Sequence, residues 1–105
     1  MAVELATDAN FKDLVANQEK VVVKYFADWC GSCRLFAPKY KRLSDDPRFQ
    51  GITFVDVNSE MNPEARSMGK VTELPFFAVF KEGKLTQTIA SNKEEAIIQA
   101  ILELG

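Results

Sequence analysis

Runs of apolar residues alternate along the chain with segments in which apolar residues recur every three or four positions. The runs at residues 21–27 and 76–80 are rich in β-branched and aromatic side chains on both faces. This pattern is typical of central strands covered by helices on each side. Residues 52–57 form a third such run, and residues 3–6 are a candidate short first strand. We expect these segments to form the core of a sheet.

Two helices are predicted in the first half of the chain. Thr7 or Asp8 can cap a helix that runs to about residue 18, because apolar residues there lie three and four apart. A second helical pattern follows the cysteines and ends at residues 45–47. Pro38 lies inside it, which predicts a kink there or a break before it.

Two more helices are predicted in the second half. Asn62 as a cap and Pro63 at the first helical position open a short helix, which Gly69 closes. Ser91 and Glu94 have the spacing of a capping box. The helix behind them carries an apolar stripe formed by Ala96, Ile97, Ala100, Ile101 and Leu104.

A hairpin signal at residues 81–84 precedes an antiparallel return over residues 85–90. Strands joined through helices pair in parallel, and the hairpin adds antiparallel strands at the end. We see no internal repeat, low-complexity tract or linker. Residues 1–105 are therefore expected to form a single α/β domain with a central mixed β-sheet flanked by helices on both faces.

Composition and charge exclude several classes of function. The 105 residues are 47% hydrophobic and 27% charged, as in an ordinary folded domain. A net charge of −2 supplies no basic field, so no nucleic-acid partner is expected. The absence of histidine excludes Ser-His-Asp and Cys-His catalysis and imidazole-bound metals. Two cysteines fall short of the four ligands of a structural zinc site, so no metal is expected.

The sequence also suggests a compartment. No stretch approaches the roughly 18 apolar residues of a membrane span, so no membrane partner is expected. Residues 1–8 carry acids where a signal peptide would have a basic segment and an apolar run. We therefore expect an intracellular, cytoplasmic protein. Persistent structural disulfides are rare in the cytoplasm, so two closely spaced cysteines favour a redox function.

Cys30 and Cys33 lie where a buried strand passes into a helix. Their spacing allows the two sulfurs to bond in a small ring. Cys30 falls near the helix N-terminus, where free amides and the helix dipole favour a thiolate, with a pKa lowered to about 3.5–7.5. Cys33, one turn further, is placed to attack a mixed disulfide formed at Cys30.

The segment Trp29-Cys30-Gly31-Ser32-Cys33, followed by Ala37-Pro38 and later by Leu74-Pro75, resembles the thioredoxin family. The resemblance covers nearly the whole chain, including its length, strand order and the hairpin at residues 80–83. Two cysteines three residues apart are weak evidence alone. Together with the preceding Trp and the two prolines they are specific, and they imply the thioredoxin fold.

The resemblance implies a division of labour within the motif. Cys30 would be the exposed attacking thiolate and Cys33 the buried resolving thiol, with Gly31 and Ser32 supporting the site. Ser32 stands where thioredoxins usually have proline, so it restores a backbone donor and adds a hydroxyl. For a two-electron dithiol–disulfide couple, about 30 mV corresponds to 1.4 kcal/mol. One hydrogen bond is therefore enough to alter the reduction potential of the Cys30–Cys33 couple. The direction of that change stays open.

The resemblance also implies a docking surface for substrates. Pro75 would follow a cis peptide bond and face the disulfide, and the Leu74 backbone would pair with an extended substrate segment as an added strand. Trp29 would shield the cysteines and form part of the surface. Phe76 replaces the usual threonine and Ala90 the usual glycine, and both would flank the groove. These two departures bear on partner choice.

Lys24 and Asp56 are the single charges in their apolar runs. Thioredoxins typically carry a buried acid at the position of Lys24, and some members have a lysine at that of Asp56. Our hypothesis is an inverted ion pair below Cys33, in which Lys24 favours the thiolate or relays a proton. In the alternative, Lys24 extends its ammonium group to the surface and takes no part.

We therefore expect a thiol–disulfide oxidoreductase that reduces protein disulfides through Cys30 and Cys33 and takes part in electron transport. Its expected partners are disulfide-containing client proteins and an upstream reductase, and the chain itself is expected to be a monomer. No bound cofactor is needed, because electrons arrive through another protein's dithiol. Two alternatives stay open: a non-catalytic docking module with this fold, and a redox sensor for one dedicated partner.

Overall fold

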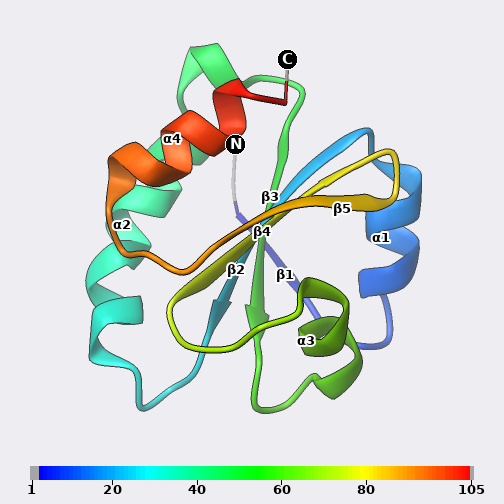
Figure 1. Ribbon diagram of the computed structural model, residues 1–105, viewed down its shortest axis with the longest axis vertical. Coiled ribbons are helices and arrows are strands. Elements are labelled where there is room, and N and C mark those ends of the chain that lie inside the picture. The colour runs from blue at the N-terminus through cyan, green and yellow to red at the C-terminus, as the bar shows by residue number, and fades with distance from the viewer. Residues whose placement is uncertain (1–2, 105) are drawn as a thin grey trace.

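The computed structural model describes residues 3–104 and consists of a five-stranded sheet between two pairs of helices (Figure 1). The elements in chain order are β1 (Glu4–Ala6), α1 (Phe11–Asn17), β2 (Lys20–Phe26), α2 (Gly31–Ser44), a 3-10 turn (Pro47–Phe49), β3 (Thr53–Asn58), α3 (Pro63–Gly69), β4 (Phe76–Lys81), β5 (Lys84–Ile89) and α4 (Glu94–Leu102). None of these helices is long and apolar enough to cross a bilayer. Most boundaries lie within a few residues of those predicted.

The sheet is mixed, as predicted, and its strand order is β1-β3-β2-β4-β5. β3 pairs in parallel with β1 and β2, whereas β4 pairs antiparallel with β2 and β5. The end of β2 therefore lies beside the start of β4, with Tyr25 opposite Phe76. This arrangement brings the segment after β2 and the segment before β4 to one end of the sheet.

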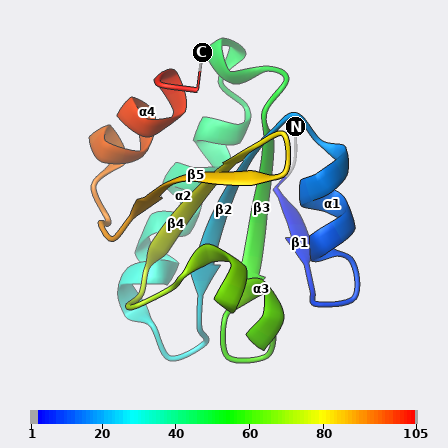
Figure 2. The same ribbon diagram turned by 45° about the vertical axis from the view of Figure 1, so that its right-hand side comes forward.

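Helices cover both faces of the sheet: α1 and α3 lie on one side, and α2 and α4 on the other (Figures 1 and 2). Successive residues of β2 contribute to opposite cores. Val23 packs in the cluster that contains Phe11 of α1, and Val22 packs in the one that contains Phe36 of α2. Since both faces are buried, β2 is apolar at nearly every position.

The predicted caps of α1 are wrong. Neither Thr7 nor Asp8 caps this helix, which begins at Phe11 after a turn closed by a hydrogen bond from the Asn10 amide to the Thr7 carbonyl (3.1 Å). Asn10 occupies the cap position without a side-chain hydrogen bond to the helix. The turn uses the residues that sequence reasoning assigned to the first helical turn.

Asp8 instead caps α3. Its carboxylate accepts hydrogen bonds from the backbone amides of Glu64 (3.2 Å) and Ala65 (2.8 Å), where α3 begins. Asn62, the predicted cap, occupies the cap position but makes no side-chain cap bond; its Oδ1 accepts from the Asp8 amide (2.9 Å). The two residues thus tie the β1–α1 loop to α3.

Two further local predictions change. Ser91 and Glu94 do not form a capping box, because α4 begins after Lys93, and Ser91 Oγ accepts from the Lys93 amide (3.0 Å). α2 continues through Pro38 without the break considered from the sequence. Leu104 is buried but lies beyond the end of α4.

Candidate active site

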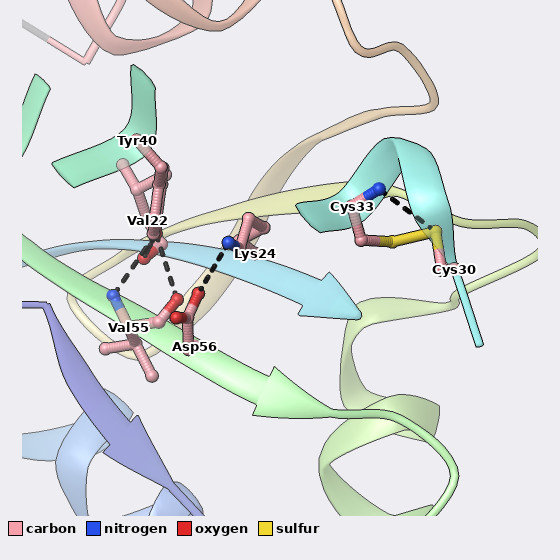
Figure 3. Close-up of polar contacts among 7 residues, drawn as sticks. All are labelled: Val22, Lys24, Cys30, Cys33, Tyr40, Val55 and Asp56. Atoms are coloured by element: carbon pink, nitrogen blue, oxygen red, sulfur yellow. Dashed lines mark hydrogen bonds and ion pairs between the residues drawn. A yellow bond between two sulfur atoms is a disulfide. The ribbon is translucent and has the colours of Figure 1, made fainter. Parts of the chain in front are cut away.

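The two cysteines form a disulfide at the start of α2 (Figure 3). Cys30 is the N-cap residue, and its Sγ accepts a hydrogen bond from the Cys33 amide (3.2 Å). Their Cα atoms are 5.3 Å apart. The helix N-terminus thus places a free amide on the Cys30 sulfur, as the spacing predicted.

Both cysteines are buried in this disulfide form, with Cys30 4% and Cys33 2% exposed. The expectation that Cys30 is exposed is therefore wrong for the oxidised protein. The pair packs against Ala27, with Phe26 and Leu74 at the edge of this cluster. The reacting bond lies just beneath the surface.

The residues beside Cys30 are exposed. Trp29 is 66% exposed, so its ring lies at the surface. Gly31 is also exposed, and a Cβ atom at this position would meet nothing within 4 Å. The chain itself therefore does not require glycine there for steric reasons, and the space above Gly31 is open to another molecule.

Ser32 lies next to the Cys30 sulfur, with 3.7 Å between Oγ and Sγ. The Cys30 sulfur thus has two neighbouring donors, the Ser32 hydroxyl and the Cys33 amide. Donors directed at a sulfur stabilise its thiolate form. The serine that replaces the usual proline adds one of these donors.

The Leu74–Pro75 peptide bond is cis, as expected. Leu74 lies between two surface hollows of about 150 and 220 Å³. Trp29 and Glu73 border the smaller hollow. Ser32, Pro75 and Ala90 border the larger one, together with Glu73.

Phe76 does not flank this groove. It is the first residue of β4, and its buried ring points into the core, where its centroid lies 6.4 Å from that of Tyr25. Because neighbouring strand residues point to opposite faces, its place in β4 fixes this direction. This orientation contradicts the expectation from the sequence that Phe76 flanks the groove.

Lys24 and Asp56 form the hypothesised ion pair (Figure 3). They lie opposite each other on β2 and β3, with 3.4 Å between Nζ and Oδ1. The Lys24 side chain is only 4% exposed, so the alternative in which its ammonium reaches the surface is wrong. Burial raises the pKa of Asp56, and the Lys24 ammonium opposes this rise.

A cleft of about 230 Å³ joins this ion pair to Cys33. Lys24, Asp56 and Cys33 all line it. Asp28 and Arg34 also line it, and the Arg34 guanidinium donates a hydrogen bond to the Asp28 carbonyl. The structure thus brings together Cys33 and the two charges that the sequence hypothesis combined.

Tyr40 is a residue of the site that sequence reasoning missed. Its ring centroid lies 5.2 Å from the Lys24 ammonium, a cation–π distance. Its hydroxyl lies within hydrogen-bond distance of the Val22 carbonyl (2.8 Å) and of both backbone groups of Val55 (2.9 and 3.2 Å). The helical spacing Cys33, Ala37, Tyr40 would have placed it below the cysteines.

Within residues 3–104, no group of three or more cysteine or acidic side chains is arranged to hold a metal ion. The site itself brings together two bonded sulfurs, one buried ion pair and hydrogen-bond donors beside the Cys30 sulfur. Reversible formation of the Cys30–Cys33 bond is the reaction that this set supports.

Comparison with known proteins places this site in a family. The family model described as Thioredoxin matches residues 2–103. Thioredoxin-1 of Schizosaccharomyces pombe is 32% identical over 105 residues, covering 97% of this chain and 100% of that protein. Thioredoxin-2 of Pyricularia oryzae is 36% identical over 104 residues, covering 95% of this chain and 60% of that protein.

Solved structures of similar shape are also thioredoxins. A thioredoxin of Plasmodium falciparum has a TM-score of 0.89 at 29% identity, with 98% of this chain and 100% of that chain covered. Thioredoxin f2 in complex with ferredoxin:thioredoxin reductase has a TM-score of 0.88 at 25% identity, covering 98% and 94%. These similarities favour a redox enzyme over a non-catalytic docking module. With its full-length match and its Cys30–Cys33 disulfide, the chain belongs to the thioredoxin family of thiol–disulfide oxidoreductases.

Proposed function

We propose that the reduced chain reduces disulfides in client proteins, with Cys30 as the attacking and Cys33 as the resolving thiol. The observation that carries this assignment is the position of the disulfide, with Cys30 at the N-cap of α2 beside the exposed Trp29 and Cys33 facing the inner cleft. A sulfur beside the exposed rim is the one that a client meets first.

The two steps exchange one disulfide for another. The Cys30 thiolate attacks a client sulfur, forms a mixed disulfide and releases the other client sulfur as a thiolate. Cys33 then loses its proton and attacks Cys30 Sγ, which releases the second client thiolate. The client thiolates take up protons. Two electrons pass to the client, and this chain ends with the Cys30–Cys33 bond.

Clients are proposed to bind along the rim formed by Trp29, Leu74, Pro75 and Ala90. Leu74 lies between two hollows and contacts the cysteine cluster, so its backbone is available beside the reacting bond. An extended client segment can add to such a backbone as a strand. Its side chains on either side would then enter the two hollows.

The electrons are proposed to come from an upstream reductase with its own dithiol. A similar thioredoxin forms a complex with ferredoxin:thioredoxin reductase, which supports a donor of this general kind. We further propose that the chain acts as an electron carrier in the cytoplasm and as a monomer. A redox-active cysteine pair suits a reducing compartment, where structural disulfides are rare.

A trapping experiment tests the two thiol roles. Cys33→Ser should accumulate a mixed disulfide with client proteins, because the resolving attack is lost. Cys30→Ser should accumulate far less, and Ser32→Ala, which keeps both thiols, should accumulate none beyond wild type. Non-reducing gel electrophoresis measures each adduct.

Turnover distinguishes the remaining alternatives. Wild type should reduce many equivalents of insulin disulfide with dithiothreitol as electron source. A single equivalent would indicate a redox sensor. A docking module would be indicated by two results together: wild type shows no insulin turnover, and Cys30→Ser still binds its partner.

A further inference from the structure

The two charges of the buried pair lie in a definite order relative to solvent. The Lys24 side chain is 4% exposed and the Asp56 side chain 27%, so the ammonium is the inner member and the carboxylate the outer one. Within residues 3–104, Lys24 is the only charged residue that is buried. In the view of Figure 3, its side chain lies between Asp56 and the cysteine pair.

The inner position of the ammonium is held by aromatic rings. The ring centroids of Tyr40 and Phe26 lie 5.2 and 5.9 Å from Lys24 Nζ. The Tyr40 hydroxyl is bonded to the backbones of β2 and β3, which fixes this ring below the ammonium. Lys24 therefore stays beside the cleft and does not turn outward.

Of the four charged residues that line the cleft, Lys24 is the most deeply buried. Asp28 and Arg34 line the cleft, are exposed, and are linked through the Arg34 bond to the Asp28 carbonyl. Asp56 directs a buried, hydrogen-bond-free oxygen toward Lys24, while its side chain retains contact with solvent. Water screens the exposed groups more strongly than the buried ammonium.

We propose that this order, Lys24 inside and Asp56 outside, stabilises the Cys33 thiolate and so favours the dithiol form over the disulfide. Lys24 is a positioning residue here, because it acts through the potential at Cys33 and not by contact with a client. A cation stabilises a nearby thiolate, and a couple whose reduced form is stabilised is more oxidising. The proposal rests on the proposed exchange reaction and concerns the balance between its two forms.

Two single variants should move the couple in opposite directions. Lys24→Met removes the inner cation and should shift the equilibrium with glutathione toward the disulfide. Asp56→Asn keeps the cation, removes its counter-charge and should shift the equilibrium toward the dithiol. We expect each shift to be about tenfold, which corresponds to about 30 mV for this two-electron couple. Glu95→Gln, an exposed acid on α4, is the charge-matched control and should leave the equilibrium unchanged.

The second readout is the thiolate itself. In a Cys30→Ser background only Cys33 reacts with iodoacetamide, so the pH profile of alkylation reports the Cys33 pKa. Lys24→Met should raise this pKa and Asp56→Asn should lower it. Shifts of the same sign in both variants, or none, would overturn the proposal. Loss of packing alone would change stability, measured by urea unfolding, without opposite pKa shifts.

The double variant Lys24→Asp with Asp56→Lys restores a pair of the opposite order. If only the presence of a pair matters, this variant should behave like wild type in every measurement. If its order matters, Cys33 should keep a raised pKa and the couple a more reducing equilibrium even where stability is recovered. Because alkylation needs no client, a negative result here is distinct from a failure of the trapping experiment.

Discussion

Asp56 experiences two opposing influences. Burial raises the pKa of its carboxyl above the ordinary 3.8, and the Lys24 ammonium reduces this rise. Burial has the larger effect, because the pKa remains raised overall. The ion pair is therefore held together by the fold and is a weak source of stability by itself.

This balance predicts a pH dependence. A carboxyl whose pKa is raised on folding binds protons more tightly in the folded state, so its contribution to stability is complete below pH 3.8 and is lost as the pH rises through the raised value. The free energy of unfolding of wild type should therefore fall relative to that of Asp56→Asn over this window. Urea unfolding at a series of pH values measures the difference. A relative rise with pH would mean that Lys24 outweighs burial.

At the level of residues, the sequence predicted which side chains meet better than how exposed they are. Cys30, Cys33 and the Lys24–Asp56 pair were predictable because spacing and strand register fix them. The burial of Cys30 was not, because it depends on Leu74, which arrives from a loop more than 40 residues away. The inward direction of Phe76 depends likewise on where β4 begins.

α3 is a short helix whose start is stabilised from another part of the chain. Asp8 supplies the acceptor for two of its free amides across 56 and 57 positions of sequence. The Tyr25 hydroxyl donates to the Ala65 carbonyl (2.8 Å), which ties the same helix to β2. A helix of 7 residues is marginal without such contacts.

Removal of this cap should weaken the fold. Asp8→Ala should lower the free energy of unfolding by about 1 kcal/mol, the typical loss for a helix N-cap. Asp8→Asn keeps an acceptor oxygen and should lose less. Asp13→Ala, an exposed acid on α1, is the control for the change of charge. Equal urea midpoints for Asp8→Ala and Asp13→Ala would contradict a capping role.

At the level of elements, the alternation of strands and helices was predictable from period alone, and so was the start of α3 at Pro63, whereas the side chains that cap the helices were not. Asp8 next to a helical pattern is a good local cap, but its acceptor serves α3. Ser91 likewise accepts from the amide of Lys93 before α4 begins. In both cases a nearby or distant backbone amide competes for the side chain, and tertiary packing decides which one binds it.

The molecule has two cores, one on each face of the sheet, and β2 and β4 contribute to both. The cysteine cluster is small by comparison and lies at one end of the sheet. The fold therefore depends on the packing of the sheet against its helices. The disulfide lies outside the two main cores and contributes little to this packing.

Reduction should accordingly leave the chain folded. The disulfide joins residues only three positions apart, and closing so short a loop contributes about 2 kcal/mol in the chain-entropy model. Urea unfolding with and without dithiothreitol should show a cooperative transition in both states. The free energy of unfolding should be lower in the reduced state by no more than this amount. The double variant Cys30→Ser, Cys33→Ser should resemble the reduced protein. A reduced chain that is unfolded in buffer would show that the disulfide has a structural purpose.

Trp29 is the one indole in the sequence, and it lies at the exposed rim beside the cysteines. Emission excited at the red edge of the protein's absorption band therefore originates at that rim and nowhere in either core. The chain carries its own optical reporter at the place where sulfur exchange occurs. Arrival of a client, or the opening of the bond, is readable in real time without attaching a dye.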